Sequence, residues 1–186
     1  MFLRIRSLLF PLALLMLLSA PLAAQNEGQT KLDEATSLKL DADSPADLAK
    51  VIELCEEAIE LGLDEGNTKL AKQILAASAL QRAQMTVQQL PRVANNPNAI
   101  RNLRRETMKD LEKAVEHNPQ LAEALILMAK LETLPGGSRE RALENINKAI
   151  EALKDKPVDQ ANVYILRAGL QEDNEDKLAD LSKAIE

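Results

Sequence analysis

The chain has 186 residues, of which 46% are hydrophobic, and this length allows one domain with a moderate core. Its formal net charge is −6, and an acidic surface repels the phosphate backbone of nucleic acids. Trp is absent, and Tyr164 is the only aromatic residue after Phe10, which leaves no platform for stacking bases. Binding of DNA or RNA is therefore not expected.

Residues 1–24 have the layout of a secretory signal peptide. Arg4 and Arg6 precede an apolar run at 8–18, and small residues follow up to Ala24, where we expect cleavage. The run contains Pro11 and is shorter than the roughly 20 residues that a membrane-spanning helix needs. No Cys stands at the cleavage region, so a lipid anchor is not indicated. The sequence predicts an exported protein, periplasmic or extracellular, without stable membrane insertion after cleavage.

The remaining chain has apolar residues at helical spacing, punctuated by helix start and stop signals. Ser44 before Pro45, Asn118 before Pro119, and Ser138 are each typical of a helix start. The residues around Gly136 break the chain between two helices. We predict a loop at 91–99 and helices at 29–39, 46–61, 67–89, 99–117, 120–134, 139–154, 159–171 and 175–186.

One short pattern recurs along the chain as "DLEKAVE", "NINKAIE" and "DLSKAIE". Its shared alanines are Ala114, Ala149 and Ala184, spaced by 35 and 35 residues, and Ala58 aligns with them 56 residues earlier. A second row of alanines precedes three of these, at positions 83, 129 and 168. A period near 34 residues with two helices per unit is typical of tetratricopeptide repeats, so the longer interval requires an insertion of about 22 residues.

Each shared alanine is accompanied by apolar residues at fixed offsets. A small side chain lets two helices approach closely, so we expect Ala149→Leu to be among the most damaging substitutions. The offsets predict one buried stripe on the second helix of every unit. Its members three residues before the alanine are Cys55, Leu111, Ile146 and Leu181, and those one residue after it are Ile59, Val115, Ile150 and Ile185.

From about residue 30 to 186, the chain resembles the tetratricopeptide repeat (TPR) family. The resemblance is carried by "LAEALILMAKL" with "RALENINKAIE" and by "LRAGLQ" with "LADLSKAIE". Ala129, Ala142 and Ala149 match the small positions of a unit, and Ala114 with Pro119 matches the end of another. The resemblance implies an all-α solenoid of stacked antiparallel helix hairpins in residues 25–186. About four repeats are implied, at roughly 29–64, 65–119, 120–156 and 157–186.

Such proteins bind peptides or protein helices in an inner groove formed by the first helices of their units. The groove implied here mixes apolar and polar side chains and lacks the Lys/Asn/Arg cluster with which similar proteins hold a C-terminal carboxylate. By this resemblance it presents Ala77, Leu80, Gln84 and Val87, then Glu123, Ile126, Lys130 and Thr133, then Asn162, Ile165 and Gly169.

Residues that could carry chemistry are few. His117 is the only histidine, and Cys55, the only cysteine, takes a stripe position that predicts packing. The acidic segments at 56–57 and 172–176 are expected to be solvated, and "LPGGS" lacks the Lys-Ser/Thr of a phosphate loop. The basic segment at 101–106 is expected on a solvated face, neutralised by nearby acids. We therefore expect no catalytic, metal or cofactor site.

The sequence predicts a non-catalytic exported scaffold or adaptor whose partner is a protein or peptide. Two alternatives remain open: the non-catalytic N-terminal repeat region of a larger secreted enzyme, and a structural envelope component that assembles with itself. Repeat arrays usually end in a capping helix with a polar outer face. Because residue 186 falls within a second helix, we expect the native array to be longer. Partner identity, oligomeric state and the role of the 91–99 loop are left open by the sequence.

Overall fold

The computed structural model describes residues 20–186, with side chains from residue 27 onward, and this part of the chain forms nine helices and no strand. The predicted all-α class is confirmed for it. The predicted signal peptide lies outside the described residues except for positions 20–24. In chain order the helices are α1 (Ala20–Asp41), α2 (Pro45–Leu61), α3 (Glu65–Val87), α4 (Leu90–Val93), α5 (Pro97–His117), α6 (Ala122–Glu132), α7 (Arg139–Ala152), α8 (Pro157–Leu170) and α9 (Asn174–Ile185).

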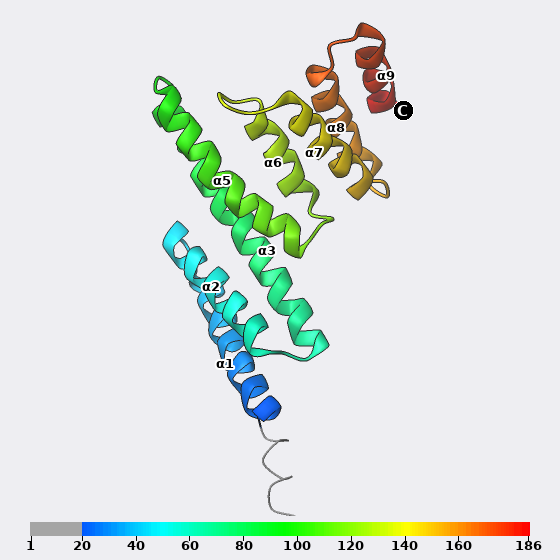
Figure 1. Ribbon diagram of the computed structural model, residues 1–186. Coiled ribbons are helices and arrows are strands. Elements are labelled where there is room, and N and C mark those ends of the chain that lie inside the picture. The colour runs from blue at the N-terminus through cyan, green and yellow to red at the C-terminus, as the bar shows by residue number, and fades with distance from the viewer. Residues whose placement is uncertain (1–19) are drawn as a thin grey trace, which may run out of the picture.

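The long helices pair into four hairpins that follow one another in a row (Figure 1). The first hairpin is α1–α2, the second α3–α5, the third α6–α7 and the fourth α8–α9. Successive hairpins contact each other through α2 and α3, α5 and α6, and α7 and α8. Each hairpin therefore packs mainly on its neighbours in sequence.

The helix starts follow from local side-chain caps. Ser44 Oγ accepts a hydrogen bond from the Asp47 amide (3.1 Å), and the Asp47 carboxylate accepts one from the Ser44 amide (3.1 Å). This capping box, with Pro45 in the first turn, fixes the start of α2. Ser138 Oγ similarly accepts from the Arg141 amide at the start of α7.

Most expected boundaries lie within two residues of the observed ones, and three differences change the interpretation of a segment or residue. The first helix is longer than 29–39 at both ends. Asn118 ends α5 and does not start a helix: its amide donates to the Ala114 carbonyl (2.9 Å), and α6 begins only at Ala122 after a turn. The predicted 91–99 loop contains the end of the four-residue α4, with Pro91 in its first turn, and the first residues of α5.

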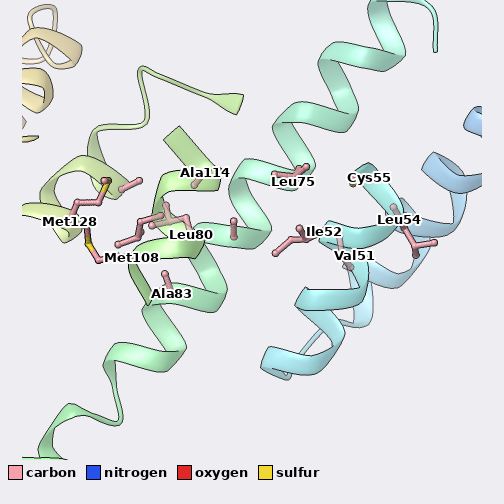
Figure 2. Packing of buried hydrophobic residues seen from close by; sticks show 14 of the residues in the cluster. Val51, Ile52, Leu54, Cys55, Leu75, Leu80, Ala83, Met108, Ala114 and Met128 are labelled. Atoms are coloured by element: carbon pink, nitrogen blue, oxygen red, sulfur yellow. The ribbon is translucent and has the colours of Figure 1, made fainter. Parts of the chain in front are cut away.

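The core consists of two main clusters on either side of α6. The first joins α2, α3 and α5 with one side of α6, and Figure 2 shows Cys55 and Ile52 of α2 on one side of α3 and Met108 and Met128 on the other. The second cluster joins the other side of α6 with α7 and α8, through residues such as Leu125 and Ile146. Helix α3 is thus covered on two sides.

Of the shared alanines, Ala114 lies in the first cluster, Ala149 in the second, and Ala58 in a smaller third cluster with Leu32 and Ala71. Ala58, Ala114 and Ala149 are fully buried, whereas Ala184 on the last helix is partly exposed. The stripe residues Cys55, Leu111 and Ile146 are likewise fully buried. Ala184 differs from the other shared alanines because no further helix in the described part of the chain packs on the outer side of α9.

Candidate functional site

A groove of about 690 Å³ runs between α6 and α8, with the C-terminal end of α7 below it. Such a volume is in the range of ligand-binding clefts, which extend from about 300 to 1,000 Å³. Its floor is apolar and its rim carries charges of both signs. The lining residues are Gln120, Leu121, Ala122, Glu123, Ile126, Lys130, Ala152, Leu153, Lys156, Asp159, Asn162, Val163, Ile165 and Leu166.

This α6–α8 groove brings together five of the side chains predicted for a binding face. They are spaced three or four residues apart along each helix, so each set lies on one side of its helix. Ile165 is 53% exposed there, although it is a large hydrophobic residue. The five are Glu123, Ile126, Lys130, Asn162 and Ile165.

The remaining predicted groove residues do not line this groove. The expectation of a surface position was wrong for Leu80, which is 6% exposed and belongs to the core cluster between α3 and α5. Val87 is partly buried against the same cluster. Helices α2 and α5 both pack against α3, and Leu80 belongs to the side of α3 that they cover. The others, Ala77, Gln84, Thr133 and Gly169, are exposed outside the groove.

The two walls of the groove are held by the interface between α7 and α8. Val163 packs with Ile146 in the second core cluster, and Gln160 Nε2 donates a hydrogen bond to the Ile150 carbonyl (3.0 Å). Arg139 donates to the Leu170 carbonyl at the opposite end of α8. These contacts fix α8 at both ends, so the groove is preformed.

Buried Arg–Asp pairs join the two helices of two hairpins, and the sequence analysis missed them. In the second hairpin, Arg82 Nε donates to Asp110 Oδ2 (2.9 Å), and in the fourth, Arg167 Nε donates to Asp180 Oδ2 (2.9 Å). The hydrogen bond with Asp180 raises the pKa of Arg167 above its ordinary value.

These pairs occupy the same place in the repeat. Each arginine directly precedes an aligned alanine of the first helix, and each aspartate stands four residues before the shared alanine of the second helix. The third hairpin has Met128 and Asn145 at these positions, both buried. The alignment of alanines was therefore the signal that could have revealed the pairs.

A second polar cluster is centred on Glu132, whose side chain is 2% exposed. It accepts hydrogen bonds from Arg104 Nη1 (3.1 Å) and the Ser138 amide (2.8 Å), and it pairs with Arg141 Nε (2.9 Å). The expectation of a solvated basic face was thus wrong for Arg104, which ties α5 to the end of α6. These contacts hold the end of α6 against α5 and the start of α7.

The other candidate residues have packing or surface roles. Cys55 is fully buried, and burial raises the pKa of its thiol to about 11, so it stays protonated at neutral pH. His117 is partly exposed beside Lys69 and Lys72. Within residues 27–186, no three His, Cys, Asp or Glu side chains gather where they could hold a metal ion. None of the helices in the described part of the chain has the length and apolar character to cross a bilayer.

Comparison with known proteins adds no relative to these observations: no family model matches the chain, and no curated protein is significantly similar to it.

Proposed function

We propose that this protein is an exported, non-catalytic scaffold of about four TPR-like hairpins that binds a protein or peptide in the α6–α8 groove. The hairpin arrangement is supported by the buried alanines at 58, 114 and 149, which recur at one position of successive second helices. Export to the periplasm or the exterior is supported by the signal-peptide pattern of residues 1–24.

The observation that carries the proposed function is the exposure of apolar side chains in a preformed groove. Ile165 is exposed in the groove, and Ile126, Val163 and Leu166 also line it. Transferring such surface from water to a ligand is favourable by about 25 cal/mol per Å². The groove therefore suits a ligand that inserts aliphatic side chains.

The rim defines the polar part of the ligand. Glu123 and Lys130 stand two helical turns apart on α6, and Lys156 and Asp159 lie near the start of α8. None of these four side chains forms an ion pair with another described residue, so all four can meet charges on a ligand. A peptide with aliphatic residues between a basic and an acidic group fits this arrangement, and a uniformly charged polymer does not.

The proposal is tested by selecting displayed random peptides on the wild-type protein. The groove variant is Ile165→Asp, whose side chain is already half exposed, and the matched control is Leu70→Asp on α3, at a site 42% exposed and outside the groove. Wild type and the Leu70 variant should enrich the same aliphatic, mixed-charge peptides, and the Ile165 variant should bind them at least tenfold more weakly. If the folded wild type enriches no sequence over Ile165→Asp, the groove is not a binding site.

A further inference from the structure

A pocket of about 450 Å³ lies between the first turns of α3 and the C-terminal end of α5. Helix α5 ends partway along α3, so the start of α3 extends past it (Figure 1). Lys69 and Lys72 line the pocket from α3, and His117 lines it from the last turn of α5. We call this the α3–α5 pocket, and it shares no lining residue with the α6–α8 groove.

The basic side chains of this pocket have no partner among the described residues. Neither lysine ammonium forms an ion pair or a hydrogen bond there, and the ring of His117 forms none either. Several other exposed lysines instead pair with an acidic neighbour on their own helix, as Lys50, Lys109 and Lys148 do. The hydrogen-bond donors of the α3–α5 pocket are therefore free to meet a ligand.

The remaining lining adds neutral donors and a single acid. Gln73 and Asn118 each carry a side-chain amide, whose nitrogen donates hydrogen bonds. Glu65 is the only acidic residue in the lining. Two ammonium groups and one carboxylate leave the pocket with a net positive charge, and protonation of the His117 ring adds to it.

We propose that the α3–α5 pocket binds the phosphate group of a small anion, either inorganic phosphate or a soluble phosphate monoester. A monoester carries about two negative charges at pH 7.5 and has three strong acceptor oxygens. Lys69 and Lys72 match the two charges, and the ring and amide N–H groups match the oxygens. A carboxylate has one charge and two oxygens, so it uses fewer of these donors. The site does not depend on the proposed function.

The charge of the rest of the chain favours a small ligand over a large polyanion. The chain has 29 acidic residues against 23 Lys and Arg, so its surface as a whole repels an anionic membrane or a nucleic acid. A small phosphate compound can enter the pocket without approaching the remaining acidic surface. The pocket therefore selects its ligand by size as well as by charge.

His117 provides a probe of this one site, because it is the only histidine of the chain. Its Cε1–H signal is followed by proton–carbon correlation NMR of the tag-free protein at pH 7.5. Inorganic phosphate or glycerol phosphate replaces chloride at constant ionic strength, which keeps the screening of charges constant. The variants are Lys69→Gln, Lys72→Gln and Glu65→Gln. The matched control is Lys154→Gln, which removes one positive charge at an exposed site outside the pocket.

The expected result is a saturable shift of the His117 signal, with a Kd of about 1 mM or tighter for at least one of the two phosphate compounds. The compound that binds more tightly identifies the source of the phosphate group. Binding should weaken at least about fivefold in both lysine variants, because each loses a charge-assisted hydrogen bond. It should strengthen at least about twofold in Glu65→Gln, which removes a like charge, and stay unchanged in Lys154→Gln.

The proposal is overturned if the signal shows no saturable shift up to about 20 mM, or if both lysine variants bind like wild type. Lys69 and Lys72 are exposed and pair with no described residue, so these substitutions leave the fold intact, which circular dichroism checks. Acetate that binds as tightly as phosphate would also overturn it, since the ligand would then be a carboxylate. Sedimentation with phosphatidylglycerol vesicles tests the membrane, and capture that depends on both lysines would overturn the choice of a small ligand.

Discussion

The buried Arg167–Asp180 pair offers a direct test of how the two helices of a hairpin are held together. Asp180 is 3% exposed and accepts hydrogen bonds from Arg167 Nε (2.9 Å) and Nη2 (2.5 Å). The third hairpin places Met128 and Asn145 at the same repeat positions. Asp180→Asn and Arg167→Met therefore each introduce one residue of the third hairpin, and their combination replaces the whole Arg–Asp pair by the Met–Asn pair.

The geometry sets the expected free energies of unfolding. A hydrogen bond to a charged group contributes about 1.5–3 kcal/mol, and removing one partner of a buried ion pair costs about 3–5 kcal/mol. Because 18% of the Arg167 side chain remains exposed, water compensates part of the loss. We expect a cost of about 2 kcal/mol for Asp180→Asn. Arg167→Met should cost about 2–3 kcal/mol, since it also removes the hydrogen bond to Asn147 (2.6 Å).

The double variant should be more stable than the sum of the single variants predicts, by about 1–2 kcal/mol. Urea unfolding followed by circular dichroism at pH 7 measures all four proteins, and equal m-values confirm that only stability has changed. The matched control is the exposed Glu144–Lys148 pair on α7, whose side chains are 62% and 56% exposed. Its coupling energy should be about 0.3–0.5 kcal/mol. A coupling between Arg167 and Asp180 no larger than this control would refute the reasoning.

Three further predictions follow from local packing. A Cβ at Gly28 would lie 2.6 and 2.9 Å from two backbone oxygens near the end of α2, so Gly28→Ala should lower the melting temperature. A Cβ at Gly169 would have no atom within 4 Å, so Gly169→Ala should stabilise the protein by about 0.5–1 kcal/mol. Equal effects of the two substitutions would contradict the close approach of α1 to α2. Ala149→Leu should cost about 1–3 kcal/mol by overpacking, and an unchanged melting temperature would count against the alanine alignment. Cys55, fully buried and with its pKa raised to about 11, should react with Ellman's reagent at pH 8 far more slowly in the native protein than in 8 M urea, and similar rates would exclude its buried position.

The helices could be predicted closely because two independent signals coincide at their ends. Apolar periodicity gives the element, and caps such as Ser44 and Ser138 give its first residue. The prediction of a helix start at Asn118 was wrong because an Asn before Pro suits the end of a helix as well as its start. The last carbonyls of α5 have no hydrogen-bond donor within the helix, and the Asn118 amide donates to one of them.

The groove residues could be predicted only on helices whose packing neighbours are those expected from the sequence. On α6 and α8, the resemblance to the TPR family implied a binding face with Glu123, Ile126 and Ile165, and these residues line the open groove. The same expectation was wrong for Leu80, because α3 is contacted by both α2 and α5. Which helix covers which face depends on relative lengths and angles that a pattern of residue types does not contain.

The Arg–Asp pairs join the two helices in two hairpins whose turns differ greatly in length. Arg82 and Asp110 are 28 residues apart in sequence, whereas Arg167 and Asp180 are 13 apart, yet both pairs have the same Nε–Oδ2 distance of 2.9 Å. The additional residues between Arg82 and Asp110 mainly form α4, the turns beside it and the longer first part of α5. In these two hairpins the charged pair keeps the same contact between the helix faces, while the connection between the helices differs in length.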